Sequence, residues 1–75
     1  MFIKDEHGKP IVLPLANWRK MKGLTQKSLA KQAEVTERTI QNYEDDTKNI
    51  RNARYSTIKR IAEALGIGTD NIFFD

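Results

Sequence analysis

A break of three residues between two helical segments restricts the fold of this chain more than any other feature. From Gln26 to Ala33, apolar side chains recur at helical spacing, and a second helical segment follows Thr36 and runs to about Asp45. Only residues 34–36 separate the two segments. A connection this short cannot fold the second helix back antiparallel to the first, so the two helices must meet at a steep angle.

Threonines and glycines mark where further helices begin and end. Thr25 and Thr36 each offer a hydroxyl just before a helical segment, and threonine is a favoured N-cap. Gly23 and Gly66 stand where helices commonly end in a left-handed residue. The side chains expected to face the core are Leu15, Trp18, Leu29, Ala30, Ala33, Val35, Ile40, Tyr43, Ile58, Ile61, Ala62 and Leu65.

These signals predict five short helices with tight connections, and therefore an all-α fold. The first helix runs from Leu15 towards Gly23, and the two described above follow it. The fourth helix carries the apolar residues of 58–65, and the fifth is a short helical turn near 70–73. The polar stretch 46–54 has no long apolar run and is expected to be a connection.

The segment 1–14 differs from the rest and is predicted to be an arm preceding a helical domain over 15–75. Two apolar runs, at 2–3 and 11–13, flank a polar turn that contains glycine. This pattern fits either a β-hairpin or an arm that lays its apolar residues over the helices. The exposed edge of such a hairpin readily pairs with its twin, so we expect the segment to contribute to dimerisation.

Composition excludes several classes of protein. The 75 residues include no cysteine, so no disulfide or thiolate site supports the fold, and the cytoplasm is the expected compartment. No apolar run is long enough to span a bilayer, and Asp5 and Glu6 interrupt any signal-peptide pattern, so no membrane partner is expected. His7 is the single histidine, and no nucleophile, base and acid occur in a recognisable arrangement. We therefore expect no metal, no cofactor, no small-molecule substrate and no enzymatic activity.

The outward face of the third helix carries side chains suited to DNA. With Ile40 and Tyr43 facing the core, Arg38, Gln41 and Asn42 face outwards. Arginine donates two hydrogen bonds to guanine, and the amides pair with adenine. A net charge of +3 is compatible with a polyanionic partner. An ordinary solvated helix face is the alternative interpretation.

Four segments together resemble the lambda-repressor-like, Cro/CI-type helix-turn-helix family. They are residues 23–30, 35–40, 43–44 and 61–67. The similarity covers about 15–74 and implies a five-helix DNA-binding domain of bacterial or phage type. It also implies a transcriptional repressor that occupies its operator as a homodimer on double-stranded DNA, with the helix at about 37–45 in the major groove.

The resemblance assigns DNA contacts to single residues. Gln26 would contact a phosphate and brace the recognition helix, and the helix N-terminus after Thr25 would face the DNA backbone. Glu37, Arg38 and Asn42 would read bases. Basic residues in the connection either contact phosphates or are simply solvated. The expected DNA-binding residues are Thr25, Gln26, Lys27, Thr36, Glu37, Arg38, Gln41, Asn42, Lys48 and Arg51.

Arg19 and Glu44 match a family pair that forms a largely buried ion pair between the first and third helices. Three features depart from the family pattern. Glu34 replaces the usual glycine of the turn, so it must accept a positive φ or the turn must differ. Asp46 replaces the glycine usual after the third helix, and the connection that follows is longer and lacks a proline. The acidic pair Asp45 and Asp46 would repel phosphate, which favours the alternative of an antitoxin-like or regulatory protein-interaction module that keeps the scaffold without reading DNA.

Overall fold

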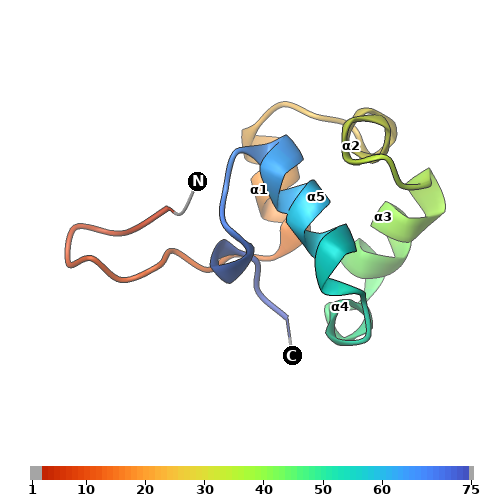
Figure 1. Ribbon diagram of the computed structural model, residues 1–75. Helices are drawn as coiled ribbons and strands as arrows, with labels where there is room; N and C mark the ends of the chain where they lie inside the picture. Colours follow the sequence, from red (N-terminus) through yellow and green to blue (C-terminus); the bar gives the residue numbers. More distant parts are fainter. Residues whose placement is uncertain (1–2, 75) are drawn as a thin grey trace.

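This computed structural model describes residues 3–74, which contain five α-helices and a final 3₁₀ turn (Figure 1). They are α1 (Leu15–Met21), α2 (Gln26–Ala33), α3 (Glu37–Asp45), α4 (Lys48–Arg51), α5 (Tyr55–Leu65) and η1 (Thr69–Asn71). Extended pairing in this part of the chain is limited to isolated bridges. The all-α prediction is therefore confirmed.

Helices α2 and α3 begin at the threonines predicted to cap them. Thr25 Oγ1 accepts a hydrogen bond from the Ser28 N–H at 3.0 Å, and the Ser28 hydroxyl accepts one from the Thr25 N–H at 2.9 Å. Thr36 Oγ1 accepts from the Thr39 N–H at 3.1 Å. Each cap satisfies an N–H group that the helix itself leaves unpaired.

The turn between α2 and α3 keeps a left-handed residue although it lacks glycine. Glu34 has φ 59° and ψ 43°, so it accepts the positive φ that its position demands. The Val35 N–H then donates to the Ala30 carbonyl at 2.9 Å, which closes the end of α2. The left-handed backbone costs a non-glycine residue about 1 kcal/mol. The short connection predicted from the sequence is thus present, at a small cost in backbone strain.

The core lies where α1, α2, α3 and α5 meet. Helix α2 packs against both α3 and α5, and α1 packs against α3. Val35 in the turn and Tyr43 on α3 are partly buried against this core, as expected from their spacing. The buried hydrophobic residues are Leu15, Trp18, Leu29, Ala30, Ala33, Ile40, Ile50, Ile61, Ala62, Leu65, Ile67 and Ile72.

The polar connection after α3 contains a helix that the sequence pattern did not predict. Helix α4 buries Ile50, and Asn49 Nδ2 donates to the Asn42 carbonyl of α3 at 2.7 Å. A helix of four residues makes little more than one turn, so it has no periodicity to detect. Asp46 is extended at φ −151°, and its carboxylate accepts the Lys48 N–H at 2.9 Å. The chain therefore leaves α3 without the left-handed residue that a glycine would supply.

The N-terminal arm combines the two structures that its sequence allowed. It turns back on itself like a hairpin, but only a single antiparallel bridge joins Lys4 to Pro10 within the described part of the arm. The base of the arm also lies over the helices. Phe2, predicted to pack there too, lies outside the described residues. The arm residues packed against the core are Ile3, Ile11 and Leu13.

Asn71 ties the arm to the C-terminal segment. This side chain is fully buried, at 0% exposure. Its amide donates to the carbonyls of Ile3 at 2.6 Å and Ile11 at 2.9 Å. Its Oδ1 accepts the N–H groups of Ile3 at 2.8 Å and Gly68 at 2.9 Å, and its backbone carbonyl accepts the Trp18 indole N–H. Every hydrogen-bonding atom of the side chain is therefore satisfied without water.

The predicted ion pair between Arg19 and Glu44 is present and joins α1 to α3. Arg19 Nε donates to Glu44 Oε2 at 2.7 Å and Nη2 donates to Oε1 at 3.0 Å, while the two side chains are only 12% and 8% exposed. Arg19 Nη1 also donates to the Leu24 carbonyl at 2.8 Å. The hydrogen bonds to Glu44 raise the pKa of Arg19 above its ordinary value although burial acts against them, so the guanidinium stays charged.

Replacing Glu44 with alanine should lower the free energy of unfolding by about 3 kcal/mol, because Arg19 is left largely buried without its partner. The double variant Arg19→Met, Glu44→Leu should recover much of that loss, because neither charge remains to be desolvated. Urea and thermal melts measure both changes. Glu63→Ala, which removes an exposed carboxylate from α5, is the control. A Glu44→Ala protein that melts like the parent would show that the pair contributes nothing to stability.

Asn71→Ala should cost about 3 kcal/mol and release the arm, because it leaves buried backbone groups without their partners. Hydrogen exchange at the Ile11 and Leu13 N–H groups measures the release directly, and a thermal melt measures the stability. Asn17→Ala makes the same substitution at an exposed site on α1 and should leave both unchanged. Retained protection of the arm amides in Asn71→Ala would contradict the role given to this side chain.

Candidate nucleic-acid interface

Helix α3 presents one exposed polar face along its length. Ile40 is fully buried and Glu44 points to Arg19, and together they fix the rotation of the helix about its axis. The positions on the other side recur at spacings of three and four residues, so their side chains share a face. The exposed residues of this face are Glu37, Arg38, Gln41, Asn42 and Asp45.

Two side chains of this face are free to bind a ligand. Arg38 and Asn42 make no side-chain hydrogen bond within residues 3–74. Gln41 Nε2 lies 3.5 Å from Glu37 Oε2, a distance at the limit for a hydrogen bond, so that contact restrains both side chains only weakly. Glu37 is the first residue of α3, where a carboxylate interacts favourably with the helix dipole.

The N-terminus of α2 lies against the same helix. Gln26 Nε2 donates to Glu44 Oε1 at 3.1 Å, so the amide is braced on the carboxylate that also holds Arg19. One amide proton and the carbonyl oxygen of Gln26 remain available. The backbone N–H groups of Gln26 and Lys27 have no acceptor within the described residues. Free N–H groups at the positive end of a helix are suited to bind a phosphate.

Basic and acidic residues alternate where α3 passes into α4. Lys48 and Arg51 are exposed on α4, which packs against α3. The Asp46 carboxylate accepts the Lys48 backbone N–H, so it is engaged in the turn. Asp45 is exposed at the end of α3 and remains the one carboxylate of this acidic pair without a partner among the described residues.

Two supporting side chains were not predicted from the sequence. Asn49 fastens α4 to the Asn42 carbonyl on α3. Arg60 Nε donates to the Ala33 carbonyl at 3.1 Å, so this α5 residue closes the C-terminal end of α2. Neither carries a local signal, because each looks like an ordinary polar surface residue until the fold brings its acceptor near.

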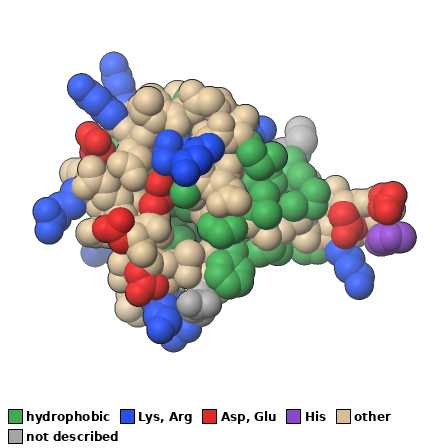
Figure 2. Space-filling view, turned by 180° about the vertical axis from the view of Figure 1, so that it is seen from behind, with side chains coloured by type: hydrophobic (Ala, Val, Ile, Leu, Met, Phe, Trp, Pro, Cys, Tyr) green, Lys and Arg blue, Asp and Glu red, His purple; other side chains and the backbone are tan. Residues whose placement is uncertain are grey.

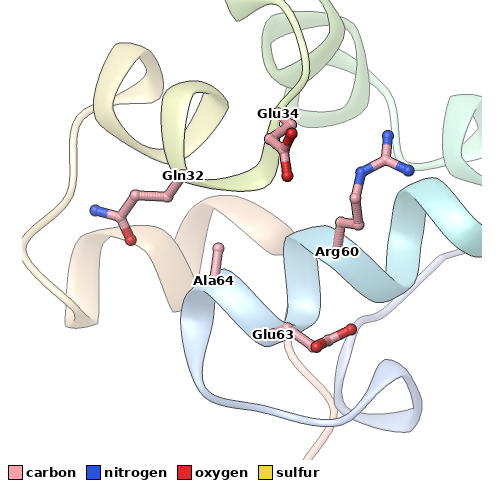
Figure 3. Close-up of a pocket in the computed structure, with 5 residues that line it drawn as sticks. All are labelled: Gln32, Glu34, Arg60, Glu63 and Ala64. Atoms are coloured by element: carbon pink, nitrogen blue, oxygen red, sulfur yellow. The ribbon is translucent and has the colours of Figure 1, made fainter.

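A polar hollow of about 390 Å³ lies between the end of α2 and α5, and none of its lining residues comes from α3. Figure 3 shows Arg60 and Glu63 extending from α5 and Glu34 at the end of α2. The remaining lining residues are Gln32 and Ala64. This lining consists of two carboxylates, a guanidinium, an amide and a methyl group, and it contains no serine, threonine, cysteine or histidine.

Neither a metal cluster nor a membrane span occurs within residues 3–74. No three His, Asp or Glu side chains lie close enough together there to share a metal ion. No helix in the same range has the length and apolar character that crossing a bilayer requires.

Comparison with known proteins agrees with this geometry. A family model described as helix-turn-helix matches residues 15–72. No curated protein and no solved structure matches the chain. The matched range begins with α1 and ends just after η1, so it contains every helix described above. The chain therefore belongs to the lambda-repressor-like helix-turn-helix family of DNA-binding regulators.

Proposed function

We propose that this protein is a sequence-specific repressor of transcription and that α3 is its recognition helix. One observation carries the proposal. Arg38 and Asn42 are exposed and unpaired within the described residues, on a helix whose other face is held by Ile40 in the core and by the Arg19–Glu44 ion pair. A rigid helix with free arginine and amide groups matches what the major groove offers.

The face of α3 supplies groups for direct base reading. Arg38 donates two hydrogen bonds to guanine O6 and N7, and Asn42 pairs with adenine N6 and N7. The Gln41 side chain, which lies on the same face, can also pair with adenine. Glu37 accepts from the amino group of cytosine. Each well-placed pair contributes about 1–3 kcal/mol of discrimination against a wrong base.

Phosphate contacts surround this face. The N-terminus of α2 offers the Thr25 cap, the remaining amide proton of Gln26, whose Nε2 also donates to Glu44, and the Lys27 ammonium, and Thr36 caps the neighbouring helix. Lys48 and Arg51 add positive charge on α4. Such contacts position the protein on the duplex without selecting a sequence.

The protein acts as a homodimer in this proposal. A single module of this size buries little surface on DNA, which limits both affinity and specificity. Two copies place a recognition helix in successive major grooves and block the operator sterically. Selection of bound duplexes from a random pool tests the function, because it reveals a preferred sequence and the spacing of its half-sites together.

A second candidate function is a protein-interaction module without DNA binding, favoured by the exposed, unpartnered Asp45 at the end of α3. A carboxylate there would repel a phosphate. A shift assay on nonspecific duplex at two salt concentrations separates the two candidates. Binding that weakens steeply with salt supports the DNA reader, and no binding at low salt supports the interaction module.

Arg38→Ala and Asn42→Ala should each weaken binding to the selected duplex by about 1–3 kcal/mol and leave nonspecific binding nearly unchanged. The reason is that base contacts distinguish one DNA sequence from another, whereas phosphate contacts hold the protein on any duplex. Titrations against selected and scrambled duplexes measure the two affinities. Lys59→Ala and Asn17→Ala, at exposed sites on α5 and α1, remove a comparable charge and amide as controls. Equal losses on both duplexes would show that Arg38 and Asn42 contact the backbone instead.

Lys27→Ala should weaken binding to every duplex alike and reduce the slope of log K against log salt by about 1, because one phosphate contact is lost. Lys31→Ala is a matched control, since Lys31 is exposed one turn further along α2, away from its N-terminus. A slope that changes equally in both variants would mean that the general charge of α2 matters and the proposed contact does not.

A further inference from the structure

The backbone carbonyl of Asn42 on α3 is held mainly from outside its own helix. In a regular α-helix this carbonyl accepts the N–H of the residue four positions later, which is Asp46. Asp46 has left the helix, with φ −151°, and its N–H reaches the Asn42 carbonyl at 3.4 Å, beyond the usual range of about 2.7–3.2 Å. Asn49 Nδ2 on α4 donates to the same oxygen at 2.7 Å. The shorter of the two hydrogen bonds therefore comes from α4.

Helix α4 is anchored well enough to act as this support. Ile50, next to Asn49, is 4% exposed and belongs to the hydrophobic core. The Asp46 carboxylate accepts the Lys48 N–H at 2.9 Å, and the Asp46 carbonyl accepts the Asn49 N–H at 2.9 Å. A continuous path of contacts therefore runs from the core through α4 to the backbone of Asn42.

Little apolar packing is available to replace the hydrogen bond from Asn49. Ile50 is the one apolar residue among the four of α4, and it is buried in the core. In Figure 2 the hydrophobic side chains of the face on view gather beside the arm, which extends from the end of the molecule opposite α3 (Figure 1). Where α3 passes into α4, the exposed residues are polar or charged, and they are Asn42, Asp45, Asp46, Lys48 and Asn49.

The two reading side chains of α3 are thus supported by different parts of the molecule. Arg38 lies in the first turn of the helix, which is capped by Thr36 and held in the core by Ile40. Asn42 lies one turn later, where its carbonyl accepts from Asn49. Side chains one turn apart on a recognition helix meet different base pairs. A change in the Asn49 contact should therefore affect one base pair of the operator and spare the other.

We propose that Asn49 is a positioning residue for base reading, which fixes the backbone of Asn42 so that its amide meets one base pair of the operator in the correct orientation. The inference rests on the proposed function, because it gives Asn49 a part in reading DNA. An amide pairs with adenine through two hydrogen bonds that must be aligned at once, so a displaced backbone lowers discrimination. Asn49 acts through Asn42 and needs no contact with DNA of its own.

Titration of the full chain against the selected duplex and its single-base-pair variants tests the proposal. Arg38→Ala and Asn42→Ala first identify the base pair that each side chain reads. Asn49→Ala should then lower discrimination about fivefold at the Asn42 base pair, because one hydrogen bond within a protein changes an equilibrium about two- to tenfold. Discrimination at the Arg38 base pair should equal that of the parent.

Two further variants separate the hydrogen bond from other effects. Asn49→Asp keeps the shape of the side chain, but a carboxylate has no proton to donate, so it should lose the same discrimination as Asn49→Ala. Repulsion between its charge and the phosphates affects all duplexes alike and cancels in the ratio of affinities. Asn52→Ala removes an exposed amide at the end of α4 and should leave discrimination unchanged. Circular dichroism melts establish that every variant is folded.

The chemical shift of the Asn42 carbonyl carbon, measured by NMR without DNA, reports the contact directly. It should move in Asn49→Ala and in Asn49→Asp and stay in place in Asn52→Ala. On the selected duplex, the double variant Asn42→Ala, Asn49→Ala should bind no more weakly than Asn42→Ala, because Asn49 acts through the side chain that is already absent.

Each outcome has a defined meaning. An equal loss on all duplexes in Asn49→Ala overturns the inference, because it shows that Asn49 itself contacts a phosphate. An Asn42 carbonyl signal that stays in place in Asn49→Ala overturns it too, as does discrimination that Asn49→Asp retains. A chain that selects no duplex from the random pool refutes the proposed function. A chain that selects a duplex, but keeps its discrimination at the Asn42 base pair in Asn49→Ala, refutes this inference alone.

Discussion

The rigid presentation of α3 depends on the contact between the Arg19 guanidinium and the Glu44 carboxylate. Helix α3 buries a single residue completely, Ile40, and Tyr43 is only partly buried beside it, so apolar packing alone sets the rotation of this short helix weakly. The bidentate ion pair removes this freedom, and Gln26 adds a third hydrogen bond from α2 to the same carboxylate. Desolvating two charges is costly, so such a pair is better understood as setting orientation than as adding stability. The outer face of α3 is defined because its inner face is anchored.

Local chemistry explains why much of the fold was predictable. Helix ends follow from the Thr25 and Thr36 hydroxyls, and the core faces of α2 and α5 follow from the spacing of their apolar residues. Helix α4 was missed because one turn has no period. Asn71 was missed because its partners, Ile3 and Ile11, lie 68 and 60 residues away, and no local pattern records such a contact.

The candidate site also has a part that was predictable from the sequence and a part that was not. The exposed face of α3 was predictable, since a helix with Ile40 and Glu44 inward must turn Arg38 and Asn42 outward. The contacts that other helices make with α3 were not predictable beyond what the family resemblance implied for Gln26 and for the Arg19–Glu44 pair. The engagement of Asp46 with the Lys48 N–H changes how the acidic corner is interpreted, because a carboxylate used in a turn differs from one aimed at the ligand. That use of Asp46 depends on α4, which the sequence pattern did not reveal.

The contacts of Asn71 also set an order of events during synthesis. A ribosome releases the arm first, yet the side chain that holds Ile3 and Ile11 is made only after every helix from α1 to α5. Contacts of such long sequence separation are slow to form, because a large loop must close first. The arm and its apolar residues must therefore wait for Asn71 before they can take their place on the helices.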